Sequence, residues 1–224
     1  INREKIFVTG NTVIDTLKIV KENMNTQTSR LMTKISNFCG NLDENKKIIL
    51  ITGHRRENFG NNFKKIFSSI KSLAILYPEI QFVYPVHLNP KVDEPARRIL
   101  NDIANIFLPK PLDYVSFIEL MDKAYLIISD SGGIQEEAPS LGKPVLVLRE
   151  NTERPEGIAQ GTSLLVGNDP EKIINTVIDL LENEIAYEAI AKMQNPYGDG
   201  TASQKIVEIL EEIYREENFS KCKH

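Results

Sequence analysis

Cysteine and histidine are scarce in this sequence, and long apolar runs are absent. The two cysteines, Cys39 and Cys222, and the three histidines lack the spacing of a metal site. A disulfide framework and a structural zinc site are therefore not expected. No apolar run approaches the roughly 18 residues that cross a bilayer, and no signal peptide is recognisable. We expect a cytoplasmic protein that uses no metal or other cofactor.

An excess of positive charge is also lacking. The formal net charge is −4, so the composition predicts neither a nucleic-acid partner nor an anionic membrane surface. With 224 residues, of which 41% are hydrophobic, the chain can form one large domain or two small ones. It begins with Ile1 rather than methionine, and we therefore expect it to be a piece of a longer protein.

Short apolar runs rich in β-branched residues predict the strands of a parallel sheet. They lie at Lys5–Thr9, Lys47–Thr52, Ile80–Val86, Ile106–Leu108, Tyr125–Ser129, Pro144–Leu148 and Ser163–Val166. Between most of them apolar residues recur at helical spacing, as in Phe63–Ala74, Phe117–Ala124 and Lys172–Asn183. This alternation predicts an α/β fold, namely a Rossmann-like doubly wound sheet covered on both faces. Ligands of such sheets bind at the carboxyl ends of the strands.

Two helical segments fall outside this alternation. Asn11–Asn37 is polar and helical, and Gly198–Glu217 is an amphipathic helix near the end of the chain. Because neither belongs to the sheet, both suggest packing against a missing partner domain. We therefore expect a connecting segment (1–37), a Rossmann-like domain (38–195) and a C-terminal helix (196–224) that packs toward a missing N-terminal domain.

The run Ser129–Ala138 is the most informative stretch of the sequence. It follows a predicted strand, and Ser131, Gly132 and Gly133 lie where a helix is expected to begin. A phosphate can approach such a backbone closely, and the first amides of a helix favour its negative charge. Glu137 follows Gly133 by about one turn and suits the hydroxyl groups of a ribose, which predicts a nucleotide site. The alternative is an ordinary capped helix, since serine and glycine are common at helix starts.

A second charged run, Gly53–Gly60, follows another predicted strand. His54, Arg55 and Arg56 place three potential cations there, and arginine offers phosphate a bidentate geometry. His54 can hydrogen-bond a phosphate oxygen or protonate a leaving one, because histidine titrates near neutral pH. The run is therefore a candidate anion site. The alternative is a solvated charged loop in which Arg56 pairs with Glu57.

Two further loops that follow strands carry single candidate residues. His87 lies in a turn that prolines hold on both sides, although a lone histidine is more often structural than functional. Arg154 is fixed directly ahead of a proline. It can clamp a diphosphate, or it can hold its own loop through Glu150 and Glu153, and the sequence leaves both readings open.

The turn before residue 117 begins a helix that we expect Asp113 to cap. This rigid turn has an apolar lip that can hold a flat base. Backbone groups near Leu112 can read the edge of the base, and Phe117 can line it. A simple strand-to-helix turn explains the same spacing equally well.

Together these motifs resemble the non-hydrolysing UDP-N-acetylglucosamine 2-epimerases. The segments that carry the resemblance are Val8–Asp15, Gly53–Asn58, Tyr84–Pro90, Ser129–Glu137, Arg154–Glu156 and Asn195–Gly200. They occur in the right order and cover essentially the whole chain. The resemblance implies two Rossmann-like domains in the glycosyltransferase-B arrangement with a UDP-sugar between them. This chain resembles the carboxyl-terminal, UDP-binding half with the connecting segment.

The resemblance also implies roles for individual residues. Those implied in substrate binding are His54, Leu112, Phe117, Ser131, Gly132, Gly133, Glu137 and Arg154. The serine and the two glycines would hold the diphosphate, and Glu137 the ribose. Leu112 and Phe117 would flank the uracil, whereas His54 and Arg154 would contact phosphate. His54 is also implied in catalysis.

The family's reaction is the reversible conversion of UDP-N-acetylglucosamine to UDP-N-acetylmannosamine, which feeds cell-envelope polysaccharide synthesis. It resembles an elimination of UDP followed by its re-addition on the opposite face. A base must remove the C2 proton, and the leaving diphosphate must be stabilised. The resemblance implies that the acidic residues for proton transfer belong to the missing half. We therefore expect the isolated chain to bind UDP weakly without turnover.

The resemblance implies two further partners. In bacterial members a second UDP-N-acetylglucosamine can bind beside the substrate as an activator, and Arg55 and His87 match positions that contact it. The family also implies a homodimer. The alternatives are a sister epimerase acting on a UDP-diacetamido-uronic acid, a glycosyltransferase donor domain and a non-catalytic UDP-sugar-binding module. The segment Gly53–Asn58 argues against the glycosyltransferase.

Overall fold

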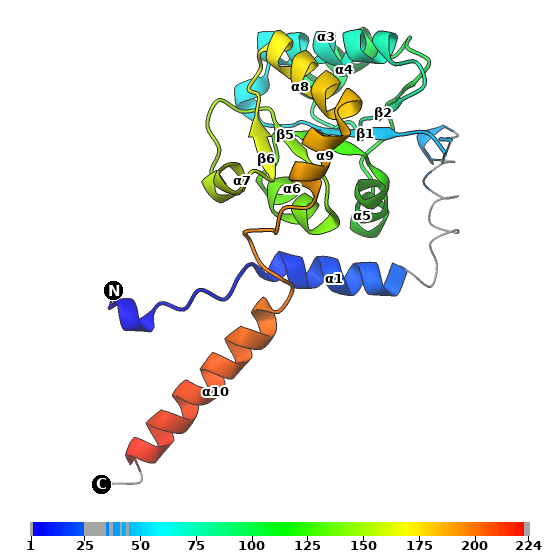
Figure 1. Cartoon of the computed structure of the whole chain (residues 1–224). Coiled ribbons are helices and arrows are strands. Elements are labelled where there is room, and N and C mark those ends of the chain that lie inside the picture. The colour runs from blue at the N-terminus through cyan, green and yellow to red at the C-terminus, as the bar shows by residue number, and fades with distance from the viewer. Residues whose placement is uncertain (1, 25–34, 36–37, 41, 44, 222–224) are drawn as a thin grey trace.

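Figure 1 shows the computed structural model of the chain, which describes residues 2–24, 35, 38–40, 42–43 and 45–221. In this part of the chain, parallel strands form one sheet in the order β3-β2-β1-β4-β5-β6. The strands are β1 (Ile48–Thr52), β2 (Gln81–Val83), β3 (Ile106–Phe107), β4 (Leu126–Ser129), β5 (Val145–Val147) and β6 (Ser163–Leu165). The strand order reverses between β1 and β4, which confirms the doubly wound sheet and puts its topological switch point there.

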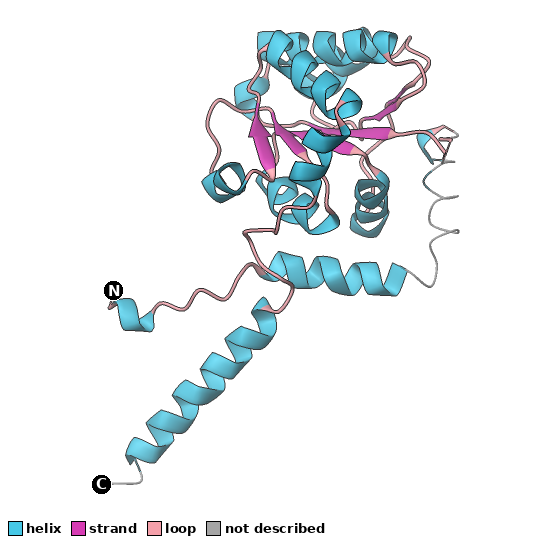
Figure 2. Ribbon diagram, in the orientation of Figure 1, coloured by secondary structure: helices cyan, strands magenta, loops and turns pink. Residues whose placement is uncertain are grey.

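Helices cover both faces of this sheet (Figures 1 and 2). One face carries α3 (Asn61–Leu76), α4 (Pro90–Leu100), α8 (Pro170–Glu182) and α9 (Glu184–Ala191). The other carries α1 (Thr12–Met24), α5 (Tyr114–Lys123), α6 (Gly132–Glu137), the 3-10 turn η3 (Ala138–Leu141) and α7 (Pro155–Gln160). Both cores draw on the same strands, because successive side chains of a strand point to opposite faces. In β1, Ile49 and Ile51 join the first core, and Ile48 and Leu50 the second.

The two ends of the described chain leave this body (Figure 1). The helix α10 (Ala202–Lys221) extends away from the sheet, as does the stretch that precedes α1. Asp15 in α1 fastens the start of α10, since its carboxylate accepts hydrogen bonds from the N–H groups of Ala202 at 3.1 Å and Ser203 at 2.7 Å. Further along, Val207, Leu210 and Tyr214 expose most of their side chains. The helix predicted here is therefore confirmed, and these three residues stay exposed in the described chain.

The predicted strand at Lys5–Thr9 is wrong. Residues Arg3–Lys5 form the 3-10 turn η1, and the chain continues without regular structure to α1. Val8 is 96% exposed. A β-branched run becomes a strand only where a neighbouring strand pairs with it, and no described strand lies beside this one. Of the helical segment predicted over Asn11–Asn37, α1 is confirmed, and the part beyond residue 24 lies largely outside the described residues.

Candidate functional site

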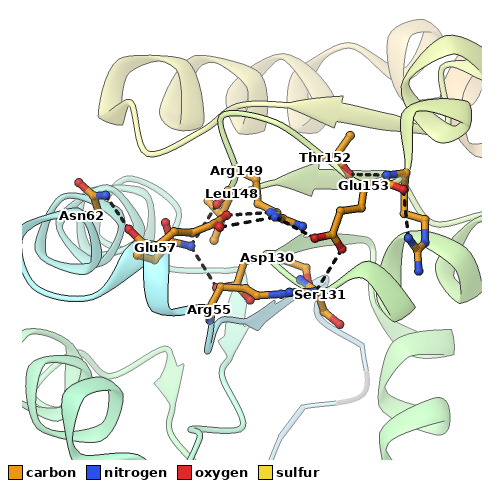
Figure 3. A network of polar contacts seen from close by, with 12 residues as sticks. Arg55, Glu57, Asn62, Asp130, Ser131, Leu148, Arg149, Thr152 and Glu153 are labelled. Atoms are coloured by element: carbon orange, nitrogen blue, oxygen red, sulfur yellow. Dashed lines mark hydrogen bonds and ion pairs between the residues drawn. The ribbon is translucent and has the colours of Figure 1, made fainter.

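Most of the sequence-predicted site residues lie at the carboxyl ends of neighbouring strands. The run after β1 contains the 3-10 turn η2 (Arg56–Asn58), and the turns after β2, β4 and β5 lie beside it. Because the strands are parallel, these loops meet at one edge of the sheet, at its switch point. Segments that are far apart in sequence therefore form a single charged surface (Figure 3).

The buried carboxylate of Asp130 organises this surface. It follows β4, is fully buried and accepts hydrogen bonds from the backbone N–H groups of His54 (3.0 Å) and Arg55 (2.9 Å). The side-chain amide of Asn58 donates to the same carboxylate at 3.0 Å and to the carbonyl of Leu148 at 3.1 Å. One carboxylate thus ties the loop after β1 to β4, and Asn58 extends the connection to the end of β5. The sequence reading did not single out either residue, although Asp130 directly follows a buried strand.

Two arginine side chains border the start of α6. A Cβ atom placed on Gly132 would lie 3.7 Å from the guanidinium carbon of Arg154 and 3.8 Å from Nη2 of Arg55. The first N–H groups of a helix have no acceptor within it, and Ser131, the N-cap residue, makes no side-chain capping bond here. Backbone donors and two guanidinium groups therefore surround one small residue. This arrangement favours an anion with several oxygen atoms.

Carboxylates lie beside these arginines, but they are not the carboxylates that the sequence suggested. Arg154 donates through Nε to Glu136, and through Nη1 to the backbone carbonyl of Glu153 at 3.0 Å. The alternative in which Arg154 holds its own loop through the side chains of Glu150 and Glu153 is therefore wrong. Glu136 can reach Arg154 because it lies one helical turn into α6, beside the loop after β5.

The pairing of Glu57 also differs from the sequence-based alternative. Glu57 accepts a hydrogen bond from Nε of Arg149 at 2.7 Å, and no ion pair with Arg56 forms. Arg149 follows β5, and its side chain is only 9% exposed. The fold therefore places Arg149 beside Glu57, where the sequence suggested Arg56. The hydrogen bond that Arg149 donates to Glu57 raises the pKa of Arg149 despite its burial. Glu153 lies 3.7 Å from Arg149 and 3.9 Å from Arg55, which completes the chain of charges in Figure 3.

The structure brings the histidines of two loops together. The rings of His54 and His87 stack with centroids 5.6 Å apart and planes inclined by 19°. Nδ1 of His87 accepts the backbone N–H of Asn89 at 3.1 Å, and Nδ1 of His54 lies 3.6 Å from Oδ1 of Asp130. Nδ1 of His87 is therefore engaged by the backbone, whereas Nδ1 of His54 lies near the Asp130 carboxylate but beyond hydrogen-bonding distance.

Glu137 lies at the other end of α6, buried against α5. Its carboxylate accepts a hydrogen bond from the hydroxyl of Tyr114 at 2.7 Å, a partner that the sequence reading missed. Burial raises the pKa of Glu137, and the nearby charge of Glu136 adds to the increase, while the Tyr114 bond opposes it. Tyr114 follows the helix cap Asp113, so the bond joins the turn before α5 to α6.

That turn forms a small recess. Asp113 caps α5 as predicted, accepting from the N–H of Ser116 at 2.9 Å. A cavity of about 120 Å³ lies beside it, and its lining is Ile35, Phe38, Pro111, Leu112, Asp113 and Ser116. Both Leu112 and Phe117 pack against the second core, and Leu112 also lines the cavity. Of the two residues expected beside a base, only Leu112 lines this recess.

The described residues contain neither a metal-binding cluster nor a helix that could span a membrane. Among them, no group of histidine, cysteine, aspartate and glutamate side chains gathers in a way that could hold a metal ion. No helix in this part of the chain has the length and apolar character needed to cross a membrane.

A doubly wound sheet with charged loops at its switch point belongs to the class of Rossmann-like ligand-binding domains. The family model for UDP-N-acetylglucosamine 2-epimerase matches residues 1–211. A protein of that name from Yersinia pestis is 54% identical over 206 residues, which are 92% of this chain and 54% of the relative. The chain therefore belongs to the UDP-N-acetylglucosamine 2-epimerase family, and it spans about half the length of this relative.

Two solved relatives have the same fold. The Neisseria meningitidis UDP-GlcNAc 2-epimerase, solved with UDP-GlcNAc bound, is 48% identical with a TM-score of 0.88, and the match covers 95% of this chain and 57% of that one. The Methanocaldococcus jannaschii enzyme, solved with UDP-GlcNAc and UDP, is 32% identical with a TM-score of 0.73, covering 94% and 56% of the two chains. The expected Rossmann-like half of a glycosyltransferase-B arrangement is thus confirmed.

The organising role of Asp130 can be tested by its amide analogue. We expect Asp130→Asn to lower the free energy of unfolding by about 2–4 kcal/mol, because buried N–H donors lose a charged acceptor. Urea denaturation measures the change. Asp122→Asn is the matched control, since Asp122 pairs with Lys21 at the surface and its loss should cost less than about 1 kcal/mol. Equal small effects of the two substitutions would contradict the assigned role.

Proposed function

We propose that this chain is the UDP-binding half of an enzyme that epimerises UDP-N-acetylglucosamine at C2. The observation that carries the proposal is the pair of guanidinium groups, from Arg55 and Arg154, that borders Gly132 at the start of α6. A diphosphate is the anion of the right charge for this position. The ligands of the solved Neisseria and Methanocaldococcus relatives, UDP-GlcNAc and UDP, support the same ligand class.

The other substrate contacts follow from their position around the diphosphate. The N–H groups of Gly132 and Gly133 and the hydroxyl of Ser131 would hold its oxygens, since the N–H of Ser131 already donates to Oγ of Ser129 at 3.0 Å. The buried Glu137 would accept hydrogen bonds from the ribose hydroxyls. Leu112 lines the recess that would receive the uracil. We place Phe117 behind this recess, where it supports the turn from the core rather than stacking on the base.

The chemistry assigned to this half is the stabilisation of the leaving group. In the elimination, a base removes the proton from C2, a double bond forms between C1 and C2, and the C1–O bond breaks. UDP leaves with the electron pair of that bond, so negative charge grows on its terminal phosphate. Arg55 and Arg154 would lower the energy of this charge, and His54 would donate to it through Nε2. Re-addition of UDP to the opposite face reverses these steps.

The base that removes the C2 proton must come from outside this chain. We assign this base to a domain equivalent to the remaining half of the relatives. Two exposed apolar surfaces support this assignment, namely the stretch Ile6–Val8 and the residues Val207, Leu210 and Tyr214 of α10. Both project from the body on the same side, where Figure 1 shows the two chain ends. We propose that the second domain packs on these surfaces and that residues 1–37 connect the two domains.

The family resemblance adds further proposals about the assembled enzyme. Arg55 and His87 would contact a second UDP-N-acetylglucosamine that acts as an activator. The stacking of His87 on His54 supports this, because it brings an activator within reach of the substrate site. A homodimer, a cytoplasmic location and a role in cell-envelope polysaccharide synthesis rest on the family resemblance.

Proton NMR of UDP-N-acetylglucosamine in heavy water tests whether this half binds UDP while the other half supplies the base. With this chain alone, we expect saturation transfer to the uridine signals and no deuterium at C2, because the base is missing. Growth of the mannosamine isomer would contradict the proposed division. Absence of any saturation transfer would contradict UDP binding itself. Arg154→Ala is the control variant, and its saturation transfer should be weaker because one of the two guanidinium groups is lost.

Glu137→Gln tests the ribose contact. We expect UDP affinity at pH 7 to fall by roughly 1–3 kcal/mol, because the ribose hydroxyls lose a charged acceptor. The affinity of the unaltered chain should also decrease as the pH falls through the raised pKa of Glu137, since the protonated carboxyl accepts these bonds poorly. Calorimetry measures both effects.

Inorganic diphosphate is the control ligand for this experiment, because it has no ribose. Its affinity should respond much less to Glu137→Gln. An equal loss for UDP and inorganic diphosphate would mean that Glu137 acts on the phosphate position. An unchanged UDP affinity would show that the ribose contact is assigned wrongly.

A further inference from the structure

Two segments of the family resemblance have no part in the proposed site, yet they meet in the structure. Gly10 and Asn11 lie against Tyr197 and Gly198, and the N–H of Asn11 donates to the carbonyl of Tyr197 at 2.7 Å. A Cβ atom on Gly10 would lie only 3.4 Å from Cα of Gly198. Both glycines adopt positive φ, +92° and +142°, which other residues rarely do. We call this contact the junction, and the two chain ends leave the body from it (Figure 1).

The junction is fastened to the loop of Arg154 through the side chain of Glu136. One carboxylate oxygen of Glu136 accepts from Nε of Arg154, and the other accepts from the side-chain amide of Asn11 at 2.6 Å. Asn195, which begins the second segment, donates to the backbone carbonyl of Glu136 at 2.8 Å. Glu136 is only 7% exposed, so solvent screens these contacts little.

Tyr197 makes a second connection to the same loop. Its hydroxyl donates to the carbonyl of Arg154 at 3.1 Å and accepts from the N–H of Gly157 at 2.8 Å. Tyr197 also supplies the carbonyl that receives the Asn11 N–H. The backbone and the guanidinium of Arg154 are therefore both bonded to groups that belong to the junction or contact it.

These contacts have a consequence for ligand binding. An anion at Gly132 would attract the guanidinium of Arg154 from one side while Glu136 holds its Nε from the other. An arginine held between two anionic groups has fewer orientations than one held by Glu136 alone. Since the second oxygen of Glu136 is bonded to Asn11, ordering of Arg154 should also restrict the junction. A ligand shifts an equilibrium only when it binds one state better than the other. Here the anion would bind better when the Arg154 side chain is ordered.

We infer that Glu136 is a positioning residue that couples occupancy of the anion position at Gly132 to the junction from which the chain ends emerge. This inference rests on the proposed function, because UDP is the anion. It gives the segments around Asn11 and Tyr197 a role: they transmit the state of the diphosphate site to the parts of the chain that project from the body. Glu136 need not touch the substrate in order to do this.

Amide hydrogen exchange with and without UDP tests the coupling on the full chain. The reporter is the N–H of Asn11, which donates across the junction. In the unaltered chain, saturating UDP should slow its exchange roughly fivefold or more. Glu136→Gln should still bind UDP through the remaining donors but should lose this UDP-dependent slowing. A purely structural role of Glu136 would change exchange equally with and without UDP.

Asn11→Asp is the second variant, which breaks the connection from the other side. It keeps an oxygen that can accept the N–H of Val13, as Asn11 does at 3.2 Å, and loses the donor to Glu136. The UDP-dependent slowing at the N–H of residue 11 should be lost here too. Asp15→Ala is the matched control. It removes the bonds to Ala202 and Ser203 without touching Arg154 or Glu136, so the slowing at Asn11 should persist.

The outcomes separate the coupling from the proposed function. Loss of the slowing in both junction variants, with UDP still bound, supports the coupling. UDP binding to the unaltered chain without slowing, or slowing that persists in both variants, overturns the coupling and leaves the proposed function intact. Failure of the unaltered chain to bind UDP overturns both.

Discussion

The charged edge of the sheet depends on one buried carboxylate. Within the described part of the chain, Asp130 has no lysine or arginine as a direct hydrogen-bonding partner. Two backbone N–H groups and the amide of Asn58 donate to its carboxylate instead. Backbone donors fix the path of the chain more strictly than a flexible side chain would. The direction of the loop after β1, and with it the side chains of His54 and Arg55, is therefore set by a residue that follows β4. β1 and β4 already pair directly, and the carboxylate of Asp130 extends this connection beyond the ends of the two strands into the loop after β1.

The charges around Gly132 form a balanced set rather than a simple positive patch. Arg55 and Arg154 point at the same small residue, which would be unfavourable without neighbouring anions. Glu153 and Glu136 provide these anions at the outer sides of the two guanidinium groups. Glu136 thus places the Arg154 guanidinium near Gly132 without fixing it completely, whereas Arg55 lies 3.9 Å from Glu153 and its buried Nε has no hydrogen-bond partner within the described chain. An anion at Gly132 would restrict both guanidinium groups further.

The sequence predicts those features that depend on local pattern, and it misses those that depend on the meeting of distant segments. Continuous apolar runs such as Ile48–Thr52 identify the buried strands, and the small residues after β4 identify the start of α6. The strand expected at Lys5–Thr9 fails because pairing needs a neighbour that a local pattern cannot show. Likewise, Glu57 has an arginine next to it in sequence, yet the end of β5 brings Arg149 to it instead. Asp130, Tyr114 and Glu136 act through partners 18 to 125 residues away, which no spacing rule reveals.

We propose that a diphosphate occupies the position at Gly132 between the guanidinium groups of Arg55 and Arg154. A crystal structure of the chain grown with UDP tests this position directly. We expect the diphosphate against the first turn of α6, with both guanidinium groups within hydrogen-bonding distance and Glu137 on the ribose. A UDP molecule bound elsewhere on the chain, with Arg55 and Arg154 still held only by their carboxylates, would contradict it.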